Sequence, residues 1–247
     1  MDSLAAAFDA VNARRKSIDV YTDADDVVSD LEMQFATRNV DINHRRGPPM
    51  GDRGFVIVRD ADNDFRGALS IDRLDALLSP EIHPPWQPDS PDDITDVFSF
   101  LDNTVFTSFH RRHLLAVARE IEERAWRTET GVLYVGFQRA GAFEAQREIY
   151  DRIAAECDLT IRIFIEDEWE STLDASIDVV TDSTGEIGRF WFVLFTGGPT
   201  GTASSGLLAE EQDPGRYYGF WTDDADRVGA LVSYLDATYV SDESSGD

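Results

Sequence analysis

The stretch from residue 108 to residue 164 limits the fold of this chain more than any other part of the sequence. Leu114, Val117 and Ile121 recur at helical spacing and predict a long amphipathic helix. An apolar run that ends at Phe137 predicts a strand, and a second helix and a second apolar strand follow it. This order predicts an α-β-α-β unit with parallel strands.

The same order of elements occurs twice along the chain. Residues 3–78 are expected to form helix, strand, helix, strand, strand, strand and helix, and residues 108–240 repeat this order with longer loops. The closing helices also match, since the run beginning at Asp72 aligns with the run beginning at Asp226. We expect an α+β (mixed α/β) fold of two similar α-β-α-β-β-β-α lobes with mixed sheets. We hypothesise an internal duplication, and chance similarity is the alternative.

The expected domain organisation has four parts. They are an N-terminal α/β lobe over residues 1–78, a proline-rich linker and helix over 79–107, a second α/β lobe over 108–240 and a disordered tail over 241–247. Five prolines between residues 80 and 91 interrupt regular structure and mark the linker. The tail is polar and acidic, which is typical of disorder.

Local patterns in the first lobe predict two strand pairings. The strand at 17–21 is expected to pair in parallel with the strand at 40–42, because a helix crosses over between them. Asn63 and its neighbour are expected to turn the strand at 54–58 into the strand at 65–69, which gives a hairpin.

Two aromatic runs mark the second lobe. The run at 190–195 places bulky side chains on both faces of its strand, which predicts a central strand covered on both sides. The run at 217–222 ends a strand, where Tyr and Trp side chains would be able to line a pocket for a planar ligand. Packing in the core is the favoured interpretation of the second run, and the pocket is the alternative.

The charge of the chain is strongly acidic. It has 48 Asp and Glu against 22 Lys and Arg, a net charge of −26, and Lys16 is its only lysine. Such a composition is typical of a cytosolic protein of a halophile, because a dense carboxylate surface stays hydrated where salt screens charge. A surface that binds a basic partner is the alternative, but the acids are spread along the whole chain. The charge also disfavours nucleic-acid binding.

Targeting and membrane signals are absent from the sequence. No stretch of about 18 apolar residues occurs, and the N-terminus lacks the basic start and apolar run of a signal peptide. We therefore expect a soluble, cytoplasmic protein with no membrane association. Cys157 is the only cysteine, which excludes an intramolecular disulfide and a cysteine-based zinc site.

Motifs for catalysis and metal binding are weak. His110 and His113 are three residues apart on the helix expected over 108–127, but no third metal ligand accompanies them at a recognisable spacing. Arg119 and Glu122 are expected on the solvated side of this helix. No nucleotide-binding or nucleophile motif occurs. We therefore expect no catalytic residues and no metal, and the sequence points to no particular cofactor.

The 108–164 stretch also resembles a known family. The residues that carry the resemblance lie in the long helix, at the end of the first strand and in the second helix: His113, Leu114, Leu115, Arg119, Ile121, Glu122, Phe137, Gln138, Arg139 and Tyr150. They are similar to the DICT sensory domain, named for diguanylate cyclases and two-component systems, and a looser similarity reaches the Gly219 to Trp221 run.

The resemblance implies a sensory input or relay domain, a kind usually fused to cyclase, phosphodiesterase or kinase outputs and suspected in light responses. No output domain fits in 247 residues, so a stand-alone form, similar to haloarchaeal ones, is implied. Such a form would signal through a partner protein, namely a kinase, a cyclase or a regulator.

We therefore expect a non-enzymatic sensory or regulatory domain that binds a ligand or a partner and relays a conformational change to a separate output protein. The ligand must have different affinities for two states to cause such a change. Ligands of α/β sheets tend to bind at the carboxyl ends of parallel strands, which makes Gln138 and Arg139 the central candidates. Further candidates are Arg112, His113, Trp86 and Trp221.

Two other functions stay open at this point. The first is a pure interaction module that docks to a kinase or a transcription regulator, which an exposed apolar patch without a cavity would favour. The second is an unrecognised hydrolase or transferase. A cluster of His83, His113 and paired carboxylates in one cleft would favour it.

Overall fold

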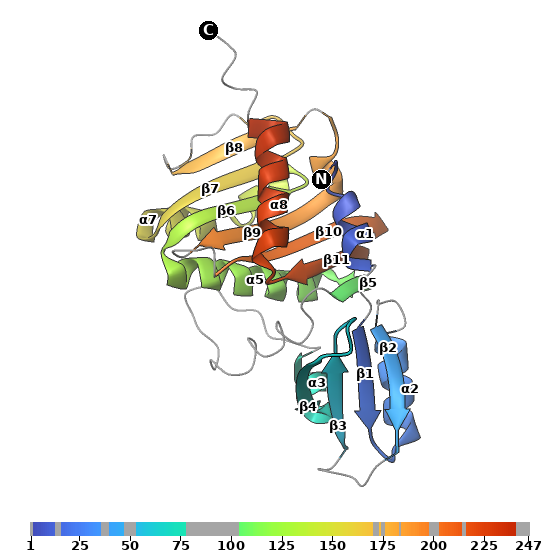
Figure 1. The fold of residues 1–247 in the computed structure, drawn as a ribbon. Coiled ribbons are helices and arrows are strands. Elements are labelled where there is room, and N and C mark those ends of the chain that lie inside the picture. Colours follow the sequence, from blue (N-terminus) through green and yellow to red (C-terminus); the bar gives the residue numbers. More distant parts are fainter. Residues whose placement is uncertain are drawn as a thin grey trace.

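The chain forms two separate sheets with helices packed on them (Figure 1). The computed structural model describes residues 2–12, 16–35, 40–46, 53–77, 104–169, 173, 176–182, 184–197, 203–213 and 216–240. The helices are α1 (Ala6–Asn12), α2 (Asp25–Phe35), α3 (Ile71–Leu77), α5 (Arg111–Thr128), α6 (Ala140–Glu144), α7 (Arg147–Glu156) and α8 (Ala225–Leu235), with the 3-10 turn η1 (Ile187–Arg189) and the π-helical turn η2 (Asp236–Val240).

The strands make a sheet of four and a sheet of seven. They are β1 (Lys16–Tyr21), β2 (Val40–Arg45), β3 (Phe55–Arg59), β4 (Phe65–Ser70), β5 (Thr104–His110), β6 (Thr130–Phe137), β7 (Asp158–Ile165), β8 (Ile177–Thr181), β9 (Phe190–Gly197), β10 (Ser205–Asp213) and β11 (Arg216–Thr222). The orders are β2-β1-β3-β4 and β5-β11-β10-β9-β6-β7-β8. The predicted α+β fold with two mixed sheets is confirmed.

Both strand pairings predicted for the first lobe are confirmed. β1 and β2 are parallel, with Ile18 opposite Ile42, and α2 makes the crossover between them. β3 and β4 form the antiparallel hairpin. Asn63 lies in its turn with φ of 65°, a left-handed conformation that asparagine tolerates better than most residues.

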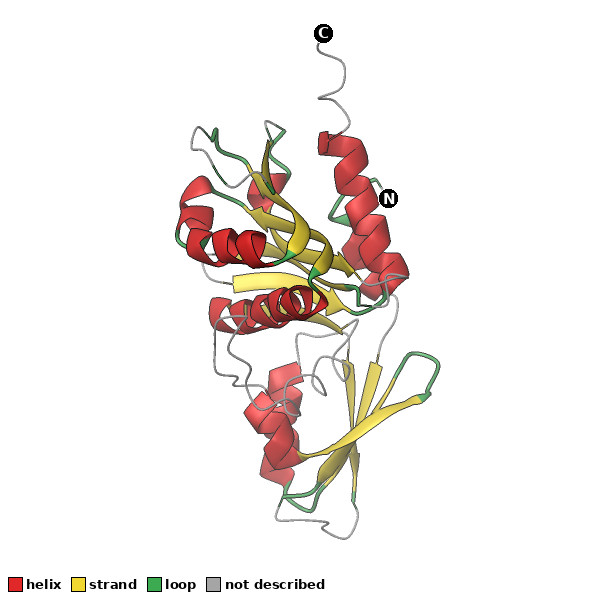
Figure 2. Cartoon of the chain, turned by 90° about the vertical axis from the view of Figure 1, so that its left-hand side faces the viewer, coloured by secondary structure: helices red, strands yellow, loops and turns green. Residues whose placement is uncertain are grey.

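The seven-stranded sheet is covered on both faces (Figure 2). One face packs against α5, α6 and α7, and the other packs against α1 and α8. β9 lies in the middle of the sheet, and Phe192, Val193, Leu194 and Phe195 are fully buried. This confirms the central strand predicted from the aromatic run at 190–195.

Helix α1 packs on the seven-stranded sheet although it precedes β1 in the chain. The Phe8 ring lies 4.8 Å from the Tyr218 ring and 5.6 Å from the Phe220 ring, centroid to centroid. The start of the chain therefore lies on the same face of the large sheet as α8. The order of elements along a sequence does not say which sheet a helix covers.

Strand β5 was not expected, and the helix predicted from residue 108 begins at Arg111 instead. Residues 104–110 pair antiparallel with β11, so backbone hydrogen bonds of the sheet extend this segment up to the first helical residue. The stretch contains Thr, Val and Phe, residue types that favour strands.

The two sheets share a pattern of strands. In the small sheet β2 and β1 are parallel and β3 and β4 follow antiparallel, and β7, β6, β9 and β10 repeat this order and these directions in the large sheet. The pattern agrees with an internal duplication, which stays a hypothesis. The expected linker at 79–91, the helix near 92–102 and the tail at 241–247 lie outside the described residues.

Gly131 is required where β6 meets β9. Its φ is 133°, and a Cβ atom there would lie 2.3 Å from the carbonyl oxygen of Thr196. Gly131→Ala is therefore expected to lower the free energy of unfolding by about 2 kcal/mol or more, from overpacking and backbone strain. Gly229 in α8 has open space where a Cβ would stand, with no neighbouring atom within 4 Å, so Gly229→Ala should raise stability by about 0.5–1 kcal/mol. Urea unfolding of both variants tests the contrast, and equal effects would contradict it.

Candidate functional site

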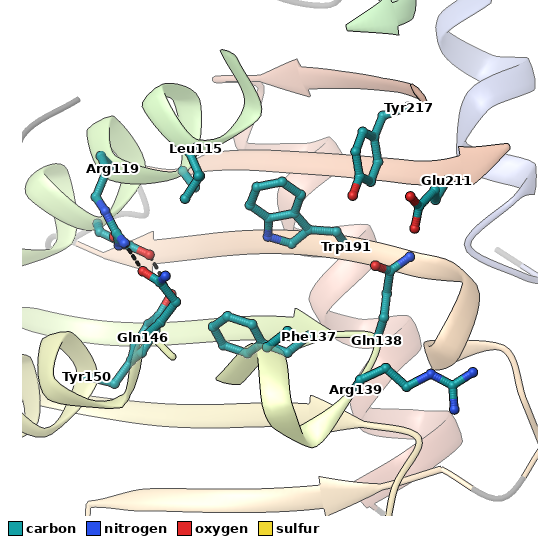
Figure 3. Close-up of a pocket in the computed structure, with 13 residues that line it drawn as sticks. Leu115, Arg119, Phe137, Gln138, Arg139, Gln146, Tyr150, Trp191, Glu211 and Tyr217 are labelled. Carbon is teal, nitrogen blue, oxygen red and sulfur yellow. Dashed lines mark hydrogen bonds and ion pairs between the residues drawn. The ribbon is translucent and has the colours of Figure 1, made fainter. Parts of the chain in front are cut away.

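A pocket opens at the carboxyl end of β6, between the sheet and the helices α5, α6 and α7 (Figure 3). Its volume is about 170 Å³. Its walls come from α5, the end of β6, α6, α7 and the strands β9, β10 and β11: Leu115, Ala118, Arg119, Glu122, Phe137, Gln138, Arg139, Ala142, Gln146, Tyr150, Trp191, Glu211 and Tyr217.

The chain turns sharply where β6 ends, and this turn directs Gln138 to the pocket. Gln138 has φ of 22°, a positive value that few residues with a side chain adopt. Its side-chain nitrogen Nε2 donates a hydrogen bond of 3.2 Å to the carbonyl oxygen of Arg189. The bond fixes the amide at the pocket edge, beside the start of β9.

Arg139 lies at the pocket edge and is held by two acids. Its Nη1 is 3.0 Å from Oε2 of Glu166 and 3.5 Å from Oδ1 of Asp167. Oδ2 of Asp167 accepts a hydrogen bond of 2.8 Å from the backbone nitrogen of Ala140, at the start of α6. Both carboxylates therefore contact the site.

A buried polar network forms one end of the pocket. Glu122 accepts hydrogen bonds from Arg119 and from the hydroxyl of Tyr150, and Arg119 also donates to Oε1 of Gln146. Only 1% of the Glu122 side chain is exposed and only 11% of the Arg119 side chain. The two residues were expected on the solvated side of the helix, and that expectation is wrong.

Burial controls the protonation of this network. Burial first, and then the Glu122 carboxylate, raise the pKa of Tyr150 well above its usual value. Burial alone would lower the pKa of Arg119, but Glu122 and Tyr150 outweigh it and the pKa is raised. At neutral pH Tyr150 therefore stays a hydroxyl donor and Arg119 stays a cation. The network is a paired structural unit at this pH.

Aromatic rings form the floor and the support of the pocket. Phe137 packs against Phe143 at 5.4 Å and edge-on against Tyr150 at 5.5 Å, between ring centroids. Trp191 meets Tyr217 in a T-shaped contact at 5.9 Å. Such contacts stabilise by about 0.5–1.5 kcal/mol beyond the area they bury. Trp191 and Phe137 lie in the middle of the pocket, with the Arg119 network at one end and Gln138 and Glu211 at the other (Figure 3).

The site residues predicted from the sequence fall into three groups: those that line the pocket, one that is buried elsewhere, and those that lie outside the described part of the structure. Gln138 and Arg139 both line the pocket. Trp221 is buried in the core on the α5 face, with 4% exposure, and is not among the residues that line this pocket. Arg112 and His113 lie in α5, but their side chains are outside the described part of the structure. Trp86 and His83 also lie outside it.

The charges of the site are largely paired with one another. Arg119 is neutralised by Glu122, and Arg139 is neutralised by Glu166 and Asp167. Among the described residues, no group of three or more His, Cys, Asp or Glu is arranged to hold a metal ion. None of the helices in the described ranges has the length and apolar character needed to cross a bilayer. The site offers aromatic surface and amide groups rather than an excess of one charge.

Comparison with known proteins gives one family. Residues 96–212 match the family DICT, described as a sensory domain in diguanylate cyclases and two-component systems. This range contains every residue that lines the pocket except Tyr217. No curated protein matches the sequence.

One solved structure is similar to the chain, the crystal structure of polyphosphate kinase from Porphyromonas gingivalis. The likeness covers 94% of this chain and 47% of that kinase, with 11% identity and a TM-score of 0.38. The chain thus spans about half the length of the kinase. A likeness at this TM-score carries no argument about fold or function.

Proposed function

We propose that the chain, whose residues 96–212 match the DICT family of sensory domains, binds a small ligand in the Gln138 pocket and signals its presence to a separate output protein. The pocket itself carries the proposal. It lies at the carboxyl end of the parallel strand β6, where α/β sheets place ligands. The output protein would be a kinase, a cyclase or a regulator.

The walls of the pocket favour an uncharged ligand with one planar ring. A volume of about 170 Å³ is small, since an apolar cavity of about 150 Å³ binds benzene. Trp191 and Phe137 provide flat apolar surface for such a ring. Gln138 and Gln146 provide amides for hydrogen bonds to its edge. A charged ligand would have to disrupt the ion pairs of Arg119 or Arg139.

The proposed role is non-enzymatic. The ionisable groups nearest the pocket floor are engaged with each other, and Tyr150 is held in its neutral form by burial and by Glu122. A group that performs acid–base catalysis needs a pKa near the working pH. Tyr150 and Arg119 both have pKa values moved away from neutrality.

A substitution that fills the pocket tests the proposal. Ala142 on α6 is half-buried and lines the pocket, so the Leu side chain of Ala142→Leu would occupy ligand space. Ala230→Leu is the matched control, since Ala230 is exposed on α8, on the opposite face of the sheet. Thermal unfolding is measured in molar salt with a panel of uncharged single-ring aromatic and heteroaromatic compounds.

We expect at least one compound to stabilise the natural sequence and the control but not Ala142→Leu. A compound at 100 times its Kd stabilises by about 2.7 kcal/mol, which raises Tm by roughly 5–10 °C for a domain of this size. A panel without any such compound would count against ligand binding. Equal shifts in Ala142→Leu and in the control would place the ligand elsewhere.

An interaction module without a small-molecule ligand is the alternative. Met33 on α2 and Phe65 on β4 are large apolar side chains with exposures of 70% and 62%. Substituting both with Ser would weaken capture of a partner protein if this module were the function. The same change leaves the ligand-induced rise in Tm intact if the pocket is the sensor.

A further inference from the structure

The segment of residues 184–189 contacts Gln138, a residue that lines the pocket. Its Arg189 carbonyl accepts the hydrogen bond from Gln138 at 3.2 Å. Gly188 in the same segment lies against Glu166, because a Cβ on Gly188 would be only 2.2 Å from Oε2 of Glu166. That same oxygen is the ion-pair partner of Arg139. Gln138 therefore holds this segment directly, and Arg139 acts on it through Glu166.

On its other side the segment holds both terminal helices through Glu186. Oε1 of Glu186 accepts a hydrogen bond of 2.9 Å from the backbone nitrogen of Leu4, at the start of α1. Oε2 accepts hydrogen bonds of 2.6 Å from the hydroxyls of Tyr234 in α8 and Tyr239 in the turn after it. We call these four residues the Glu186 clasp.

The clasp is intact at neutral pH. Burial first, and then Glu186, raise the pKa of Tyr234 to about 12 and also raise the pKa of Tyr239. Both phenols therefore remain hydroxyl donors to the carboxylate far above neutral pH. No change of protonation is needed to make or break the clasp under ordinary conditions.

Burial and local hydrogen bonds hold the segment together. Ile187 is fully buried in the core shared with α1 and α8. The carboxylate of Asp182 accepts hydrogen bonds from the backbone nitrogens of Thr184 at 2.6 Å and Ile187 at 2.9 Å. The backbone nitrogen of Arg189 also bonds to the carbonyl of Glu186 at 3.0 Å. These bonds connect Arg189 to Glu186 within one turn of the backbone.

We propose that residues 184–189 transmit ligand binding in the pocket to the Glu186 clasp. This inference rests on the proposed function and names how the site is coupled to the chain ends. Gln138 and Arg139 both line the pocket; the Gln138 amide bonds to the segment directly, and Arg139 pairs with Glu166, which lies against Gly188. A ligand that takes the hydrogen-bond donor of the Gln138 amide competes with the segment. That competition gives the ligand different affinities for the clasped and released states, as coupling between two sites requires.

The released state affects α1 and the part of η2 near Tyr239, rather than α8 and the start of η2. Asp236 has its own anchors on the sheet, since its Oδ1 accepts hydrogen bonds from Tyr134 at 2.5 Å and from Arg162 at 2.7 Å. These bonds involve no residue of the 184–189 segment. The first residues of the chain, in contrast, meet the segment directly at Leu4. The signal would therefore reach a partner through α1 and through the part of η2 that contains Tyr239.

Hydrogen–deuterium exchange on the full chain tests the coupling without any ligand. Gln138→Asn keeps a residue that tolerates positive φ but shortens the amide, so the bond to Arg189 is lost. We expect exchange in residues 2–12 and 234–240 to rise by about fivefold, the factor for one lost hydrogen bond. Arg139→Ala, which frees Glu166, should act in the same direction. Glu186→Gln weakens the clasp directly, and adding Gln138→Asn to it should give no further rise.

Gln146→Asn is the matched control. Gln146 is the other glutamine of the pocket, and its bond to Arg119 has no link to the 184–189 segment. Exchange at both chain ends should stay unchanged in this variant. Unchanged exchange at either end in Gln138→Asn and Arg139→Ala, or an equal rise in Gln146→Asn, would overturn the coupling. Because no ligand is used, the outcome is separate from that of the ligand screen.

Discussion

Arg119→Met is expected to lower the free energy of unfolding by about 3–5 kcal/mol, the cost of leaving one partner of a buried ion pair alone. The Glu122 side chain is 1% exposed and accepts hydrogen bonds from Arg119 and Tyr150. Without the guanidinium, a carboxylate remains in a site that water hardly reaches. Gln146 loses its partner in the same step. Urea unfolding at fixed salt measures the loss.

A double variant separates the effect of the buried charge on stability from the effect of lost packing. In the double variant Arg119→Met with Glu122→Gln, the uncharged amide is still able to accept the Tyr150 hydroxyl, so much of the lost stability should return. Tyr150→Phe removes one donor only and should cost about 1–3 kcal/mol. A single variant within 1 kcal/mol of the natural sequence, or a double variant as unstable as the single one, would contradict the buried pair.

Helical spacing contained a signal for this network. Glu122 follows Ala118 by four residues, so the two share a face of α5, and Ala118 is 2% exposed. An acid on the buried face of a helix needs a partner, and Arg119 is three residues away on the same helix. The sequence interpretation assigned both residues to the solvated side because of their charge, and it therefore missed the buried ion pair. The partner Gln146 comes from another helix, and no local pattern connects it to Arg119.

The location of Gln138 and Arg139 in the site was predictable, because it depends only on the order of neighbouring elements along the chain. An apolar strand in a parallel unit leads to Gln138 and Arg139, and both line the pocket. Trp191 was not predictable as a site residue. It reaches the pocket because β9 pairs antiparallel with β6 and sets Trp191 opposite Phe137. Tyr217 reaches the pocket because β10 pairs with β9 and β11 pairs with β10. The sequence specifies neither pairing.

The placement of α1 and of β5 also depends on contacts between distant segments that the sequence does not specify. Both lie in or on the large sheet. Helix α1 is close in sequence to β1, and the residues of β5 were assigned partly to the linker and partly to the helix expected over 108–127. Local periodicity predicts that an apolar face will be buried. It does not identify the surface that buries it, because that depends on contacts between segments far apart in the chain.

Phe143→Ala is the second substitution expected to have a large effect, again about 3–5 kcal/mol of unfolding free energy. The Phe143 ring is fully buried, and its centroid lies 5.4 Å from that of Phe137 and 5.1 Å from that of Trp169. Truncation leaves a cavity behind Phe137, which is part of the pocket floor. Phe65→Ala is the control on an exposed ring and should cost less than about 1 kcal/mol.

A second readout relates this packing to the proposed function. Phe143 does not line the pocket, so any effect of Phe143→Ala on ligand binding must act through Phe137 and Tyr150, the two rings it supports. Phe143→Leu keeps most of the volume and should cost less than about 1.5 kcal/mol, with ligand-induced stabilisation retained. Phe143→Ala should reduce that stabilisation even well below its own Tm. If Phe143→Ala bound the ligand as well as Phe143→Leu does, the pocket would not depend on the aromatic support beneath it.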